Sequence, residues 1–262
     1  MPLPAPSLTE RHEINKLISW PRAYTHPVLF DANRQVGSAV LLRHGSRLFA
    51  FTAAHVIEGD PKIHFHSGAE SDRTTILETL STYIHPKYDP EPPVSKFDIG
   101  ILELKPTSPG MFGNIGQLYT GEFGKPKKKK SKVKSTEFVW VVGFPSEYVD
   151  INAGGVVLKQ TAFCTQILEH SSEEISLRYP DAVYRMPHAS TSCEIGETAR
   201  TPEGYSGGGV WAMIDPPREL FNPHRHIKLV GIQTHWSPTS RLVRCVPSKI
   251  LAEAFKDFKP EL

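Results

Sequence analysis

Short runs of β-branched and aromatic residues, interrupted by glycine and proline, make up most of the chain. Runs of this composition predict β-strands. Many short strands with turns between them are typical of a sandwich or a barrel. The hydrophobic pattern therefore predicts an all-β protein. The predicted strands lie within residues 37–42, 47–57, 62–66, 74–85, 97–104, 137–144, 154–168, 174–179, 207–214 and 228–236.

Helical periodicity is present in only two stretches. "TERHEINKLI" at residues 9–18 has Thr9 as a candidate N-cap, and "PSKILAEAFKDF" at residues 247–258 begins with a proline and a serine. These patterns predict one short helix near the N-terminus and one near the C-terminus. The apolar residues on one face of the second helix are Ile250, Leu251, Ala254 and Phe255.

The clearest change in composition is the lysine-rich stretch "GEFGKPKKKKSKVKS" between two strand-rich halves. Like-charged blocks are usually solvated loops, although they also serve as handles for phosphate or anionic lipid. No aromatic residues alternate with the lysines to stack on bases, which disfavours nucleic acid as a partner. The role of the segment from Lys125 to Lys134 is left open. The predicted parts are an N-terminal extension with a short helix (1–27), a first β-barrel (28–120), the lysine-rich connector (121–135), and a second β-barrel with the C-terminal helix (136–262).

Composition excludes several classes of protein. The chain is 39% hydrophobic and 22% charged with a formal net charge of +2, which is typical of a globular protein and selects no partner. Its three cysteines, Cys164, Cys193 and Cys245, are widely spaced, which argues against a disulfide framework and a structural zinc site. The longest apolar run, residues 138–144, is far shorter than the roughly 20 residues that span a bilayer. We therefore expect a cytoplasmic protein with no membrane segment.

The stretch "TPEGYSGGGVW" contains the first candidate for chemistry, Ser206, with glycines on both sides. A serine hydroxyl is a weak nucleophile at neutral pH and needs a base, together with a third group that holds that base. His55 follows an apolar strand in "FAFTAAHVIEG", and Asp98 precedes another in "SKFDIGILEL". Each block alone is ordinary turn or core sequence, so the hypothesis depends on all three occurring together.

"GYSGG" also satisfies the G-x-S-x-G nucleophile elbow of α/β-hydrolases. That fold requires a helix after the serine, whereas "GGGVWAMI" has the composition of a strand. Its acid and histidine must follow the serine, where Asp215 and His235 are the only reasonable pair. The alternating helices of a parallel α/β protein are also missing from the pattern. The elbow interpretation is therefore disfavoured.

In order along the chain, "TAAHV", "DIGILEL" and "GYSGG" resemble the three signature blocks of chymotrypsin/trypsin-fold serine proteases. His55 and Asp98 are 43 residues apart, and Asp98 and Ser206 are 108 apart. "QVGSAVLL", "VWVVGFP", "KLVGIQTHW" and "VPSKIL" also fall where that fold expects them. The resemblance covers the chain from about Val36 onward. It is closest to the disulfide-poor bacterial branch that includes the Deg/HtrA group.

The resemblance implies two six-stranded antiparallel β-barrels and a serine endopeptidase that acts on protein or peptide substrates without a cofactor. It implies that His55 is the general base, Asp98 orients it, and Ser206 is the nucleophile. The backbone N–H groups of Gly204 and Ser206 match the oxyanion hole. Secreted relatives carry an aspartate where this chain has Tyr205, so activation by a newly cut N-terminus is disfavoured.

Specificity is less clearly encoded. By its distance from Ser206, Arg200 falls at the floor of the pocket for the residue before the cut, where it would favour an acidic side chain. Trp236 falls where relatives often have a small residue, and its bulk could narrow the pocket. Thr201, Gln233 and His235 are further candidates for the pocket lining.

Two further patterns leave alternatives open. His64 with His66, and His224 with His226, have the spacing that puts two rings on one strand face, but each pair lacks a nearby third ligand, so no metal site is predicted. A latent or inactive protease-like module that binds peptides remains an alternative function. Control by an activating protein partner also remains open.

Overall fold

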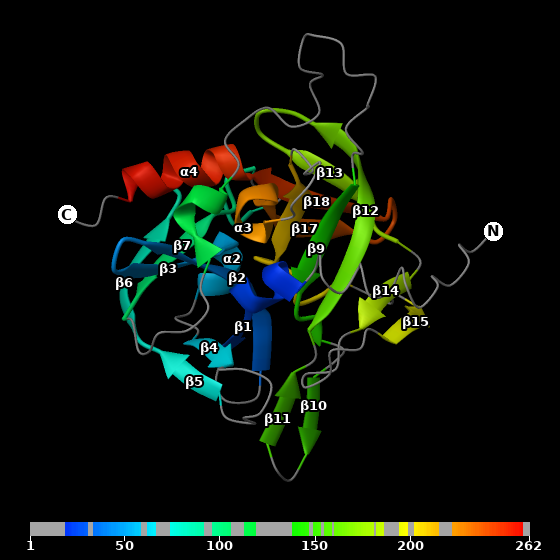
Figure 1. Cartoon of the computed structure of the whole chain (residues 1–262), viewed down its shortest axis with the longest axis horizontal. Coiled ribbons are helices and arrows are strands. Elements are labelled where there is room, and N and C mark those ends of the chain that lie inside the picture. The colour runs from blue at the N-terminus through cyan, green and yellow to red at the C-terminus, as the bar shows by residue number, and fades with distance from the viewer. Residues whose placement is uncertain are drawn as a thin grey trace.

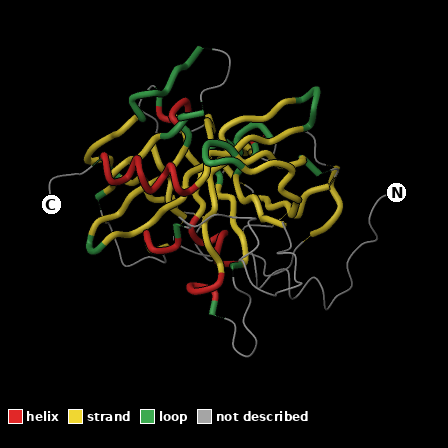
Figure 2. The backbone as a smooth tube through the Cα atoms, turned by 90° about the horizontal axis from the view of Figure 1, so that it is seen from above, coloured by secondary structure: helices red, strands yellow, loops and turns green. Residues whose placement is uncertain are grey.

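The computed structural model describes residues 19–30, 34–58, 62–66, 74–91, 96–105, 113–118, 138–146, 149–152, 155–158, 160–180, 182–185, 194–198, 202–214 and 222–258. Strands make up most of this part of the chain, with a few short helices (Figures 1 and 2). The predicted all-β class is confirmed. The helix predicted at residues 9–18 and the connector at 121–135 lie outside the described residues.

The N-terminal sheet runs in the order β5-β4-β1-β2-β3-β7-β6, with antiparallel neighbours throughout, and β8 pairs with β2 in parallel. Only Glu78 separates β5 from β6, so this bent segment pairs with β4 at one end and with β7 at the other. The bend joins the two edges of the sheet into a barrel. The strands are β1 (Thr25–Phe30), β2 (Arg34–His44), β3 (Arg47–Thr52), β4 (Lys62–His66), β5 (Thr74–Leu77), β6 (Thr79–Ile84), β7 (Gly100–Leu104) and β8 (Gly113–Asn114).

The second barrel closes through hydrogen bonds. Its strands run in the order β13-β18-β17-β16-β9-β12, and β12 pairs back with β13 to complete a ring of six. A β14-β15 hairpin extends from β12, while β10 and β11 form a separate two-stranded sheet. The strands are β9 (Phe138–Gly143), β10 (Val149–Asn152), β11 (Gly155–Leu158), β12 (Thr161–His170), β13 (Ile175–Arg178), β14 (Ala182–Arg185), β15 (Glu194–Thr198), β16 (Gly209–Met213), β17 (Ile227–Ser237) and β18 (Leu242–Pro247).

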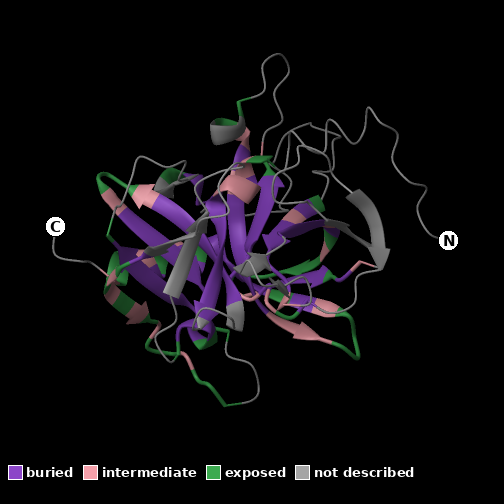
Figure 3. Cartoon of the chain, turned by 90° about the horizontal axis from the view of Figure 1, so that it is seen from below, coloured by how far each residue is buried: buried purple, intermediate pink, exposed green. Residues whose placement is uncertain are grey.

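Three groups of buried side chains hold these layers together (Figure 3). The cluster inside the first barrel is aliphatic, and the cluster inside the second includes the aromatic rings of Phe163, Tyr179 and Tyr205. A third cluster lies between the barrels and contains Trp211, which is fully buried. Burial of apolar area on this scale is the main force that holds the two barrels together.

The predicted C-terminal helix is confirmed as α4 (Ser248–Asp257), which follows β18 directly. Its apolar face returns to the first barrel, where Phe255 packs edge-on against Phe49 with ring centroids 4.9 Å apart. Phe255 also packs against Phe51 of β3 with ring centroids 5.8 Å apart, and Figure 1 shows α4 at the side of the first barrel. Residues 19–24 are also helical. No helix within the described residues is both long and apolar enough to cross a membrane.

The structure differs from the sequence expectations in several elements. Strands β1, β8, β10, β14, β15 and β18 were not predicted, because their runs are short or interrupted by polar residues. The strand interpretation of the His224–His226 pair is wrong, since both residues lie in α3 (Pro223–His226). Residues two apart on a helix do not share a face, so the spacing argument for a metal fails there.

Candidate active site

His55 is presented by α2 (Ala54–Ile57), a single helical turn that directly follows β3. The other three residues of the turn are buried in the first barrel, and the His55 side chain keeps 38% of its surface exposed. Burial of these small and aliphatic neighbours fixes the position of the backbone. The local sequence therefore places an imidazole at the barrel surface on a rigid support.

The Asp98 carboxylate hydrogen-bonds both the ring and the backbone of His55. It lies just before β7, whose residues are all buried, and its own side chain is only 4% exposed. One carboxylate oxygen is 2.7 Å from His55 Nδ1, and the other accepts the His55 backbone N–H at 3.1 Å. A carboxylate at Nδ1 selects the tautomer that carries its proton there. His55 Nε2 is then left as an acceptor.

Ser206 lies in a turn of residues 202–208, immediately before β16. Gly207 has φ +84°, and a Cβ at this position would lie 1.9 Å from the Ser38 carbonyl oxygen. Only glycine has both the backbone freedom and the lack of bulk that this position needs. The N–H of Gly207 donates to the Gln233 carbonyl at 2.7 Å, and the Gln233 N–H donates to the Gly208 carbonyl at 2.9 Å. These bonds fix the turn to β17.

Tyr205 anchors the same turn in the second barrel. Its side chain is fully buried, its ring packs edge-on against Phe163 with centroids 5.4 Å apart, and its hydroxyl hydrogen-bonds the Thr161 hydroxyl. A buried aromatic ring with a satisfied hydroxyl is a strong anchor. No charge is needed to hold the residue before Ser206.

Ser38, on β2 of the first barrel, makes four hydrogen bonds around this turn. Its N–H donates to the Ser206 carbonyl at 2.7 Å, and its hydroxyl donates to the Gly204 carbonyl at 2.9 Å. The same hydroxyl accepts the Phe144 N–H at 2.9 Å, while the Ser38 carbonyl accepts the Thr52 hydroxyl at 2.7 Å. Ser38 thus connects the turn that carries Ser206 with the strand that leads to His55.

The backbone N–H groups of the turn differ in whether they donate a hydrogen bond within the described residues. Those of Tyr205, Gly207 and Gly208 donate to carbonyl oxygens. Those of Gly204 and Ser206 donate to no acceptor among the described residues. Gly204 has φ +89°, which favours glycine there. The turn therefore leaves two alternate N–H groups available for an outside acceptor.

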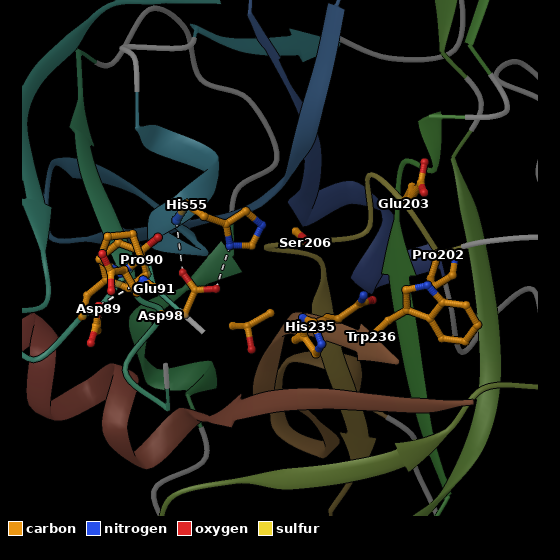
Figure 4. A pocket seen from close by; sticks show the side chains of 13 residues that line it. His55, Asp89, Pro90, Glu91, Asp98, Pro202, Glu203, Ser206, His235 and Trp236 are labelled. Carbon is orange, nitrogen blue, oxygen red and sulfur yellow. Dashed lines mark hydrogen bonds and ion pairs between the residues drawn. The ribbon is translucent and has the colours of Figure 1, made fainter. Parts of the chain in front are cut away.

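His55, Asp98 and Ser206 line one cleft with a volume of about 370 Å³ (Figure 4). In this view the His55 ring lies between the Asp98 carboxylate and Ser206. Hydrogen bonds join Asp98 to His55, whereas no described residue hydrogen-bonds the Ser206 hydroxyl. Residues far apart in the sequence and from both barrels thus meet in one open cleft. The remaining lining residues are Tyr88, Asp89, Pro90, Glu91, Pro202, Glu203, Gln233, Thr234, His235 and Trp236.

The structure brings three of the five predicted lining residues to this cleft: Gln233, His235 and Trp236. The Trp236 ring packs against Tyr179 with ring centroids 5.1 Å apart. Trp236 lines the cleft without filling it. Arg200 and Thr201 lie outside the described residues, so their predicted contribution stays a prediction.

Two neighbouring groups have shifted acidities. Burial, followed by the charges of Arg244 and His55, lowers the pKa of His235. Burial and a hydrogen bond to Glu58 raise the pKa of Tyr88. Both groups are therefore uncharged near neutral pH.

Ser38 and the acidic residues Asp89, Glu91 and Glu203 were not among the predicted site residues. The available signal for Ser38 was a polar residue inside an otherwise apolar strand. For Asp89 and Glu91 the signal was the acidic, proline-rich stretch "YDPEPP" ahead of Asp98. Neither pattern by itself shows which residues it faces. Among the described residues, no three His, Cys, Asp or Glu side chains form a group that could hold a metal ion.

The arrangement of the strands is similar to that of a solved protease structure. The chain is similar to neuropsin, a serine protease expressed in the limbic system of mouse brain, with a TM-score of 0.59 over 91% of this chain and 95% of the neuropsin chain. The chain has a chymotrypsin-like fold. The prediction of two six-stranded barrels is thereby confirmed. Sequence identity to neuropsin is 14%, so the likeness concerns the chymotrypsin-like fold alone. No protein-family model and no curated protein matches the sequence.

Proposed function

We propose that this chain is a serine endopeptidase that hydrolyses peptide bonds through an acyl-enzyme intermediate. Ser206 attacks the scissile carbonyl, and His55 accepts the hydroxyl proton and returns it to the leaving amine. Asp98 orients the imidazole and stabilises its protonated form. The observation that carries the proposal is the His55–Asp98 hydrogen bond in the cleft that Ser206 also lines.

The backbone of the turn supports the same chemistry. We assign the oxyanion hole to the N–H groups of Gly204 and Ser206, which donate to nothing else among the described residues. Donors that are already aligned stabilise the tetrahedral oxyanion without reorganisation during the reaction. Tyr205 supports a site that is formed without an N-terminal ion pair, because its anchor is the barrel interior.

We infer a relationship to the disulfide-poor Deg/HtrA-like branch. The two cysteines that the structure describes, Cys164 and Cys245, are free thiols. Burial raises the pKa of Cys164 to about 11, so it stays protonated near neutral pH. Buried protonated thiols behave as small apolar side chains.

A second candidate function is a peptide-binding module that is latent until a protein partner completes the site. The observation that favours it is the Ser206 hydroxyl, which has no hydrogen bond to His55 or to any other described residue. In serine proteases without substrate this bond is often long, so the observation fits both candidates.

Labelling with a fluorophosphonate probe tests the proposal. The probe requires an activated serine and a formed oxyanion hole, so the native chain should be labelled, and Ser206→Ala and His55→Ala should not. Circular dichroism spectra of all three proteins establish that they are folded. Labelling of the native chain that survives in Ser206→Ala would place the reactive group elsewhere. A folded native chain without labelling would favour the latent module.

A further inference from the structure

Three carboxylates other than Asp98 line the cleft, and they flank Ser206. Asp89 and Glu91 lie beyond His55 on one side, and Glu203 lies on the opposite side (Figure 4). All three residues are exposed. Asp89 Oδ1 accepts the Glu91 N–H at 3.0 Å, and none of the three forms an ion pair with another described residue.

No positive side chain balances these charges within the described lining of the cleft. That lining contains no lysine or arginine, and its basic groups are His55 and His235. Because the pKa of His235 is lowered by burial, it adds no charge near neutral pH. The residues of the described lining therefore carry a negative net charge. Clefts lined by charge of one sign concentrate ligands of the opposite sign.

An uncommitted acceptor lies in the same cleft. Gln233 is 1% exposed, and its Oε1 has no hydrogen-bond partner within the described part of the chain. A buried amide oxygen without a donor costs free energy that a ligand N–H can recover. Gln233 thus points to a ligand that places a hydrogen-bond donor in the cleft, independently of the three exposed carboxylates.

We propose that this cleft binds peptides that carry Lys or Arg on both sides of the residue presented to Ser206. The carboxylates of Asp89 and Glu91 attract the cationic side chains on one side, and Glu203 attracts those on the other. Cleavage of such peptides rests on the proposed function, whereas their binding in the cleft does not. The Arg200 prediction, which favours acidic residues before the cut, gives the opposite expectation.

Binding is measured first, with Ser206→Ala to prevent turnover. Three fluorescein-labelled octapeptides of one scaffold carry Lys, Gln or Glu at the positions flanking a central residue, and fluorescence anisotropy gives their affinities. Exposed ion pairs are individually weak, so we expect the Lys peptide to bind about tenfold tighter than the Glu peptide. Raising the salt from about 0.05 M to about 0.5 M should shrink the difference several-fold, because salt screens exposed charges.

A pair of double variants separates the cleft from overall charge. Glu91→Lys with Glu203→Lys should remove the preference for the Lys peptide or reverse it. Glu169→Lys with Glu253→Lys changes the net charge equally at exposed positions outside the cleft and should retain the preference. Loss of the preference in both double variants would show that net charge, and not the cleft, sets it.

Cleavage of the same peptides by the native chain separates this inference from the proposed function. Equal affinity for the three peptides, tighter binding of the Glu peptide, or no measurable binding overturns the inference, even if the fluorophosphonate probe labels Ser206. Selective binding of the Lys peptide without cleavage or labelling upholds the inference and overturns the proposed peptidase. Selective binding with selective cleavage upholds both.

Discussion

The two barrels hold their parts of the candidate site in different ways. His55 and Asp98 both belong to the first barrel, and two hydrogen bonds between them are made within it. Ser206 belongs to the second barrel, yet its carbonyl and that of Gly204 accept hydrogen bonds from Ser38 of the first. The base is positioned by its own barrel, whereas the turn that carries the nucleophile depends on both.

The hydrophobic cores of the two barrels also differ in composition. The first barrel is filled by aliphatic side chains, which support α2 and leave His55 exposed. The second has an aromatic group around Tyr205, the residue before Ser206. Local packing thus suffices to present the imidazole, while the serine turn needs an anchor inside one barrel and hydrogen bonds to the other. Changes at His55 or Asp98 should therefore alter chemistry, and changes at the serine turn or at Ser38 should also alter stability.

The strongest effect is expected at Asp98, which the first barrel alone holds against His55. Asp98→Asn keeps the side-chain shape but removes the charge that selects the Nδ1–H tautomer of His55. We expect kcat on a cleaved peptide to fall by about 10⁴-fold, with little loss of stability. Glu253→Gln, an exposed change on α4, is the matched control. A loss of less than about tenfold would show that Asp98 does not orient the base.

The next effect tests the rigidity of the serine turn. Gly207→Ala introduces a Cβ 1.9 Å from the Ser38 carbonyl and 2.2 Å from the Thr52 hydroxyl, at φ +84°. We expect it to lower the free energy of unfolding in urea by about 3 kcal/mol or more. Gly45→Ala has a similar φ of +60° with nothing within 4 Å, and should cost about 1 kcal/mol. Equal losses of unfolding free energy in the two variants would mean that Ser38 and Thr52 move away from the new Cβ at little cost.

The smallest effect tests the connection between the barrels. Ser38→Ala removes the hydroxyl that bonds Gly204 and Phe144, so a buried N–H loses its acceptor. We expect a loss of about 1–3 kcal/mol in the free energy of unfolding and several-fold slower labelling of Ser206. Ser240→Ala, on an exposed turn, should stay within about 0.5 kcal/mol of the native chain. Unchanged labelling in Ser38→Ala would show that the turn holds its geometry without this hydroxyl.

Much of the fold could be predicted because strand periodicity is local. The predicted strand at 228–236 lies within β17, and the helix predicted at 247–258 contains α4. Strands β1 and β14 were missed because their runs are short or interrupted by polar residues, and in the fold they are held by a neighbour on each edge. The His224–His226 pair was misassigned because a four-residue helical turn is too short to show a period.

For the site, the chain order of "TAAHV", "DIGILEL" and "GYSGG" and the glycines of the serine turn could be recognised without the structure. The fold was needed to see that His55, Asp98 and Ser206 line one cleft. It was also needed to see that Ser38 hydrogen-bonds the serine turn and that acidic residues flank this turn. The two kinds of feature differ in how far apart in the chain their interacting residues lie. Turn chemistry and strand alternation depend on neighbours in the chain, whereas the β13–β18 pairing, the β1–β4 pairing and the contact between the barrels depend on residues far apart in sequence.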